Sequence, residues 1–172
     1  MILILTACGS GSKNNAGGPA TTETEGKVYN VNFGDNFHYY RTNFVTNITS
    51  KISIKLTDPQ VLDAITENSE DIESSDFVKL FIQVENVGDG NSADAIGINN
   101  FTVYDVNGKD ISTFYYWEDK PTDEFEGYEL RPGGKNEGYI YLAIEEDSVP
   151  AEIIFYDSLI RGAHTNQFVI KM

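Results

Sequence analysis

Residues 77–86 read FVKLFIQVEN, and apolar and polar residues alternate along this stretch. The apolar residues that share one face are Val78, Leu80, Ile82 and Val84. The polar residues opposite them are Lys79, Gln83 and Glu85. Successive side chains of a strand point to opposite faces of a sheet, so the stretch predicts a strand with one buried face and one solvated face.

The same alternation recurs along the rest of the chain. It is found in SKISIKLT, where Ile52, Ile54 and Leu56 share a face, and again in INNFTVYD, EGYIYLAI, AEIIFYDS and TNQFVIKM. Short β-rich runs separated by turn residues are typical of an antiparallel sandwich. We therefore expect an all-β domain, an antiparallel β-sandwich, over residues 27–172.

Three dipeptides between these runs predict turns. Asn107-Gly108 suits a type I′ hairpin, in which both central residues adopt positive φ. Pro132-Gly133 suits a type II turn, because proline presets φ and glycine accepts the left-handed position. Asp89-Gly90 follows the strand that ends at Asn86 and is expected to close it.

Residues 57–72, TDPQVLDAITENSEDI, allow two interpretations. Asp58 could cap a helix that begins at Pro59, with apolar residues at helical spacing behind it. Alternatively, the preceding strand continues past a proline bulge to about Leu62. We favour the strand, in which case residues 66–76 form a polar loop.

Three segments carry a resemblance to a known family: FVKLFIQVENVGDG, INNFTVYDVNGKDI and ELRPGGKNEGYIYLAI. Together they resemble the telokin-like, immunoglobulin-fold domain of bacterial lipoproteins. The resemblance covers residues 77–145, and its motifs are turn motifs rather than catalytic ones. It implies an immunoglobulin-like sandwich on a surface-exposed lipoprotein, in a family largely of unknown function. Residues 109–130 depart from the family by being unusually aromatic and acidic.

The chain contains a single cysteine, Cys8, within MILILTACGS. A lone cysteine cannot form an intramolecular disulfide, and the two histidines, His38 and His164, are too few to complete a zinc site with it. Residues 5–8, Leu-Thr-Ala-Cys, resemble a bacterial lipobox. That resemblance implies that Cys8 receives a diacylglyceryl group and becomes the first residue of the mature protein. The alternative is a buried N-terminal strand with an inert cysteine.

Residues 1–8 are too short for a complete secretory signal. Such a signal has a positively charged start and an apolar region of about 7–15 residues. No Lys or Arg precedes Lys13, so we expect residues 1–8 to be the truncated end of a lipoprotein signal. Residues 9–26, GSGSKNNAGGPATTETEG, lack any large apolar residue and are expected to form a flexible tether.

The net charge of the chain restricts the classes of molecule that it is expected to bind. The 27 acidic and 12 basic residues give a formal net charge of −15. Such a field repels phosphate backbones and anionic headgroups, so we do not expect nucleic-acid binding. No apolar run after the tether reaches the ~18 residues of a membrane-spanning helix. The expected contact with the membrane is therefore the N-terminal lipid alone, on the extracellular face of the cell membrane.

Motifs of known enzymes and metal sites do not occur in the sequence. It has no G-x-S-x-G, H-E-x-x-H, P-loop or dinucleotide fingerprint, although a serine triad with one of the histidines stays open. The acidic groups of DVNGKD and DGNSAD, residues 105–110 and 89–94, do not match the ligand spacing of a calcium loop. We expect two solvated turns there, and predict neither a cofactor nor a metal.

The most distinctive segment is FYYWEDKPTDEFEGYEL, residues 114–130. Aromatic rings beside carboxylates can hold sugars or cationic groups, although a core cluster followed by a solvated loop is the simpler interpretation. If the strand is regular, the residues that share the inward face are Ile111, Thr113, Tyr115 and Trp117. Phe114 and Tyr116 would then point outward and are the candidate ligand-binding residues.

Three functions from different classes fit these features. The first is a lipid-anchored, non-enzymatic surface module that binds a wall polymer, a protein or a small ligand. The second is a structural or accessory subunit of an envelope complex. The third is an envelope glycan hydrolase, for which no catalytic motif is found. We favour the first.

Overall fold

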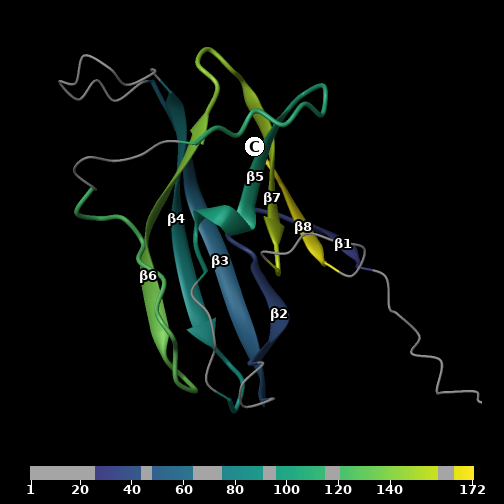
Figure 1. Ribbon diagram of the computed structural model, residues 1–172, viewed down its shortest axis with the longest axis vertical. Coiled ribbons are helices and arrows are strands. Elements are labelled where there is room, and N and C mark those ends of the chain that lie inside the picture. Colours follow the sequence, from purple (N-terminus) through teal and green to yellow (C-terminus); the bar gives the residue numbers. More distant parts are fainter. Residues whose placement is uncertain (1–25, 44–47, 64–74, 91–95, 115–120, 159–164) are drawn as a thin grey trace, which may run out of the picture.

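The computed structural model describes residues 26–43, 48–63, 75–90, 96–114, 121–158 and 165–172. Within these ranges the chain forms eight strands and one short 3₁₀ turn (Figure 1). In chain order they are β1 (Val28–Val31), β2 (Asn36–Asn43), β3 (Ile48–Leu62), β4 (Asp76–Asn86), η1 (Ile98–Asn100), β5 (Phe101–Asp105), β6 (Lys135–Ile144), β7 (Pro150–Tyr156) and β8 (Gln167–Lys171).

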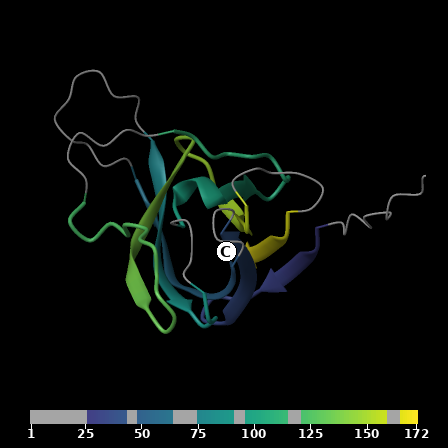
Figure 2. The ribbon, with the colours of Figure 1, turned by 60° about the horizontal axis from the view of Figure 1, so that its bottom comes forward.

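The strands form two four-stranded sheets that face each other. One sheet has the order β2-β3-β4-β6 and the other the order β1-β8-β7-β5. Figure 2 shows the two layers from a direction in which the space between them is visible. Neighbouring strands pair antiparallel except β1 and β8, which pair parallel. The predicted all-β sandwich is confirmed.

Alternation along the strands builds the core, because every second side chain faces the opposite sheet. In β4 the predicted inward residues Val78, Leu80, Ile82 and Val84 are all buried. Aromatic rings join the two layers around Phe155 of β7. Its ring centroid lies 5.6 Å from that of Phe37 and 5.4 Å from that of Tyr39, both on β2 of the other sheet. Such tilted ring pairs add stabilisation beyond the apolar area that they bury.

The strand interpretation of residues 57–62 is confirmed, because β3 continues to Leu62. Its pairing with β4 shifts register between Thr57 and Gln60, where Pro59 cannot donate a ladder hydrogen bond. Asp58 takes a left-handed φ of 52° at this bulge. The predicted loop over residues 66–76 is wrong at its end, since Asp76 already belongs to β4; residues 64–74 lie outside the described residues.

The Pro132-Gly133 turn is confirmed and lies against the end of β4. Gly133 has φ 74°, and the Gly134 amide donates to the Arg131 carbonyl at 2.8 Å, as in a type II turn. The turn is held by backbone hydrogen bonds to Asn86, whose carbonyl accepts from the Gly133 amide at 2.8 Å. Asn86, the last residue of β4, thereby connects this strand to the loop before β6.

The first residues of INNFTVYD do not form a strand. Ile98–Asn100 form the turn η1, and β5 begins at Phe101. Asn100 is fully buried, and its side-chain amide donates to the Tyr156 carbonyl at 3.0 Å, which attaches this turn to β7. Ile98 is consequently exposed rather than part of the core.

Candidate binding site

Residues 109–114 connect the edges of the two sheets. The Ile111 amide donates to the Val103 carbonyl of β5, and the Glu145 amide donates to the Ile111 carbonyl, both at 2.9 Å. The Thr113 amide then donates to the Ala143 carbonyl of β6 at 2.9 Å. The segment therefore closes one side of the sandwich without forming a regular strand of its own.

This crossing changes the expected orientation of side chains. Ile111 is only 2% exposed, as predicted for an inward residue. Thr113 is exposed, so the prediction that it shares the buried face is wrong, because the segment changes its hydrogen-bonding partner from β5 to β6 between the two residues. Phe114 is 78% exposed, as predicted. Tyr115, Tyr116 and Trp117 lie outside the described residues, so their predicted orientations stay predictions.

The hairpin before this segment differs from the predicted type I′ turn. Gly108 has φ 76°, but Asn107 is not in the positive-φ region. The Gly108 amide donates to the Asp105 carbonyl at 3.1 Å. A turn followed by a left-handed glycine is the three-residue hairpin loop, and the extra residue explains why both central positions need not be left-handed.

The carboxylates of this hairpin accept hydrogen bonds from nearby backbone amides. The Asp105 carboxylate accepts hydrogen bonds from the Asn107 and Lys109 amides, both at 2.8 Å. The bond from the Lys109 amide is the main cause that lowers the pKa of Asp105. Asp110 accepts from the Ser112 amide at 2.9 Å. Within the described residues no three His, Cys, Asp or Glu side chains are grouped to hold a metal ion; Asn91 and Asp94 of the other acidic group lie outside them.

A hollow of about 180 Å³ lies beside Phe114, between the edges of β5 and β6. Its walls come from η1, β5, β6 and residues 112–114, and are mostly apolar: Ile98, Phe101, Val103, Thr113, Phe114 and Tyr141. Ligand pockets usually measure about 300–1,000 Å³, so this hollow has room for one ring or one apolar side chain of a larger ligand. It is the best candidate binding site near the predicted residues.

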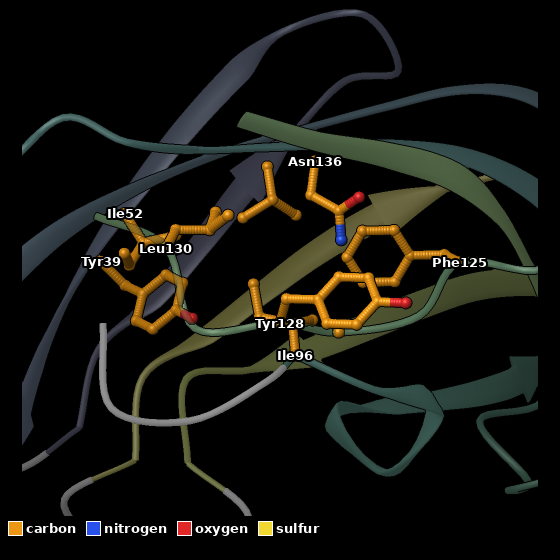
Figure 3. Close-up of a pocket in the computed structure, with 9 residues that line it drawn as sticks. Tyr39, Ile52, Ile96, Phe125, Tyr128, Leu130 and Asn136 are labelled. Carbon is orange, nitrogen blue, oxygen red and sulfur yellow. The ribbon is translucent and has the colours of Figure 1, made fainter. Parts of the chain in front are cut away.

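A second hollow, shown in Figure 3, lies at an end of the sandwich and is nearly filled. Its volume is about 10 Å³, room for no more than one water molecule. The Asn136 side chain donates to the Glu126 carbonyl at 2.6 Å, and the Tyr128 hydroxyl donates to the Glu126 carboxylate. These contacts hold residues 126–130 over the core, so this hollow is a packed end rather than a ligand site.

Residues 123–125 run along the edge of β6, where Glu124 pairs with Tyr139, and a polar clasp joins the Asp123 side chain to the outer face of β4 and β6. We define the clasp as Lys79, Asp123, Tyr139 and Tyr141. The Lys79 ammonium lies 3.1 Å from the Asp123 carboxylate and 4.0 Å from the centre of the Tyr139 ring. The Tyr141 hydroxyl donates to Asp123 at 2.8 Å. Sequence reasoning assigned Asp123 to a solvated loop; its pairing with a lysine 44 positions away had no local signal.

Charges in the clasp stabilise each other's ionised forms. Burial alone would lower the pKa of Lys79, but the interactions with Tyr141 and Asp123 outweigh it and raise that pKa. Burial would raise the pKa of Asp123, but the bonds from Tyr141 and Lys79 outweigh it and lower that pKa. The pKa of Tyr141 is raised, chiefly by burial. Lys79 and Asp123 are therefore both ionised over a wide range around neutral pH, while the Tyr141 hydroxyl keeps its proton and donates it to Asp123.

His38 lies exposed on β2, and its pKa is lowered by partial burial and then by the charge of Lys51. No described serine forms a hydrogen bond with it. His164, the other histidine considered for a triad, lies outside the described residues, as do Cys8 and the N-terminal segment. None of the described segments forms a helix long and apolar enough to cross a bilayer.

Comparison with known proteins identifies the family. The family model named Domain of unknown function (DUF4352) matches residues 31–165, which is most of the chain. The chain belongs to the DUF4352 family. The match includes β2 to β7 and the hollow beside Phe114. A search of curated proteins found no match.

Solved structures share the fold of this DUF4352 protein. The secreted protein MPT63 of Mycobacterium tuberculosis is 13% identical, with a TM-score of 0.56 over 84% of this chain and 98% of that one. The yjhA protein of Bacillus subtilis is 14% identical, with a TM-score of 0.53 over 82% and 98%. The protein ycdA of the same organism, named a "putative lipoprotein", is 13% identical, with a TM-score of 0.50 over 78% of this chain and 38% of that one. At these identities the likeness shows the fold alone.

Proposed function

We propose that this DUF4352 protein is a lipid-anchored, non-enzymatic module of the outer cell surface that binds an envelope component through the hollow beside Phe114. The observation that carries the binding proposal is the exposure of Phe114. A phenylalanine ring 78% exposed beside an apolar hollow leaves a large area in water that a ligand would cover.

The anchoring proposal rests on the residues before the domain. Leu-Thr-Ala-Cys at residues 5–8 supplies the thiol, and the Gly- and Ser-rich residues 9–26 supply a tether of on the order of 25 Å in r.m.s. length. Stable attachment requires two acyl chains, which a diacylglyceryl group provides. The names of two structural neighbours, a secreted protein and a "putative lipoprotein", agree with a location outside the cytoplasm.

The finer family assignment belongs to this proposal as well. We infer that the sandwich is the telokin-like, immunoglobulin-fold domain that the sequence resembles. In such a domain, loops and sheet edges serve for binding more readily than a deep cleft does. The hollow between the edges of β5 and β6 is a site of that kind.

The experiment measures binding of the Cys8→Ala chain, which cannot be lipidated, to isolated envelopes from the native host. We expect saturable binding that Phe114→Ala weakens about tenfold, because the substitution removes the exposed ring. Val106→Ala is the matched control, since Val106 is 77% exposed on the hairpin and outside the hollow. Treating the envelopes with protease distinguishes the two kinds of ligand, because binding to a protein should be lost and binding to a polymer should remain. Equal binding by the Phe114 and Val106 variants would disprove the proposed site.

A further inference from the structure

The outer face of the β2-β3-β4-β6 sheet carries a polar half that the clasp does not cover. The register of the sheet places Asn36 opposite Lys55, Lys55 opposite Gln83, and Gln83 opposite Glu137. Four polar side chains, one from each strand, therefore form a row across the sheet. Neighbouring strands are about 4.8 Å apart, so polar groups follow one another at about that spacing.

A second polar row lies beside the first. Ser53 is opposite Glu85, and Glu85 is opposite Lys135. These residues lie two positions away along each strand, or about 6.7 Å. The two rows line a groove of about 110 Å³. The area they define is comparable with a single pyranose ring and its hydroxyl groups.

Hydrogen bonds within the groove hold its side chains in place. The Gln83 amide donates to the Glu137 carboxylate at 2.9 Å, and the Lys135 ammonium lies 3.2 Å from the Glu85 carboxylate. Such pairing reduces the conformational entropy that a ligand must remove on binding. Each of these groups still has donors or acceptors left over.

Two side chains of the groove have hydrogen-bonding capacity that the described part of the chain does not use. The Ser53 hydroxyl makes no hydrogen bond to another described residue and is not among the buried polar atoms of the described residues, so it is accessible from the groove. Lys55 makes no ion pair with any described residue. A solvent-accessible polar group without a protein partner can bind a ligand hydroxyl without breaking a hydrogen bond within the protein.

The charge of the groove selects the class of ligand. Its two lysines, Lys55 and Lys135, balance its two carboxylates, Glu85 and Glu137, so the groove is neutral in a chain of net charge −15. The surrounding field disfavours polyanions, and paired carboxylates attract cations only weakly. Mixed donors and acceptors without net charge suit a hydroxylated, uncharged molecule.

An aromatic row borders the groove on the side toward the clasp. Register places Phe81 of β4 opposite Tyr139 of β6, next to Gln83 and Glu137. Their rings are half-buried and meet edge to face, with centroids 5.1 Å apart. Aromatic rings pack against the C–H groups of sugars while neighbouring polar groups bind the hydroxyls.

We propose that this groove binds an uncharged polysaccharide through its sugar hydroxyls, with Gln83, Lys55 and Ser53 as the principal contacts. The site lies apart from the hollow beside Phe114 and shares no residue with it. It does not depend on the proposed function, so each can fail alone.

The test is affinity electrophoresis of the Cys8→Ala chain in native gels that contain dextran, hydroxyethylcellulose or polygalacturonate. We expect at least one of the two neutral polymers to retard the protein and the anionic polymer not to. Gln83→Ala and Lys55→Ala should each weaken the retardation about tenfold, the loss of one to two hydrogen bonds. Raising the salt concentration should change the affinity less than twofold, because the ligand carries no charge.

Matched variants show whether the effect belongs to the groove. Gln60→Ala alters an exposed glutamine on the same sheet, and Lys171→Ala alters an ion-paired lysine on the other sheet. Both should leave retardation unchanged. Retardation by neither neutral polymer, retardation only by polygalacturonate, or equal retardation of the groove and control variants would each overturn the proposal.

Discussion

Replacing Asn86 by alanine should destabilise the domain strongly, because this one side chain holds two loops to the end of β4. Asn86 is fully buried. Its amide donates to the Gly90 carbonyl at 2.6 Å and to the Leu130 carbonyl at 2.9 Å, and its side-chain oxygen accepts from the Gly88 amide at 3.0 Å. Alanine removes all three bonds and provides no replacement.

The magnitude follows from those three bonds. A hydrogen bond contributes about 0.5–1.5 kcal/mol net to stability, and more when its loss leaves a buried partner unsatisfied. The free energy of unfolding should therefore fall by about 2–4 kcal/mol. With a urea m-value of about 2 kcal/mol/M, the midpoint should fall by about 1–2 M.

The assay is urea unfolding followed by far-ultraviolet circular dichroism. Asn32→Ala is the control, since Asn32 makes a single exposed bond to Asp35 at 2.9 Å and should change stability by less than about 0.5 kcal/mol. If Asn86→Ala shifts the midpoint no more than Asn32→Ala, the side chain does not hold the loops as described.

Three further predictions concern turns, clasp and tether. Gly108→Val and Gly133→Val should each cost about 1–2 kcal/mol in urea unfolding, through left-handed strain rather than a clash, since the space around both is open; unchanged midpoints would refute this. Asp123→Asn should lower stability near neutral pH by about 0.5–1 kcal/mol. The pKa of Asp123 is lowered on folding, so the difference in the free energy of unfolding between the two proteins should persist above about pH 4. It should vanish as the pH falls through the pKa of Asp123 in the folded state. A constant difference down to about pH 2 would contradict the clasp. A chain that starts at Gly26 should melt within a few degrees of the full chain; a large loss would show that residues 1–25 stabilise the domain.

The strands and the sandwich were predictable from sequence because alternation is a local property. The inward residues of β4 and Ile111 were assigned correctly from a period of two. Thr113 was not, since a segment that changes partner between sheets loses its strand geometry, and no local pattern marks the change. The turn type predicted at Gly108 was wrong for a similar reason. The length of a hairpin loop depends on which strand residues pair, and the sequence does not show that pairing.

The candidate sites were less predictable than the fold. Phe114 is exposed as predicted, but alternation does not explain it, because Ser112 and Thr113 are exposed as well. The hollow beside Phe114 brings η1 and β5 together with the later strand β6, and no local pattern predicts that contact. The polar groove brings together residues from four strands, and only the register aligns Lys55 with Gln83 and Gln83 with Glu137. Its residues are ordinary solvated strand positions when each is considered alone.

The most direct test of the central claim, a lipid-anchored surface module, is the intact mass of the mature N-terminal peptide. The protein would be expressed in its native host with a full signal and purified from the detergent phase. We predict a chain that begins at Cys8 and carries a diacylglyceryl group, and no detergent-phase mature protein for Cys8→Ala. A mature chain that begins elsewhere, or a free thiol on Cys8, would contradict the account.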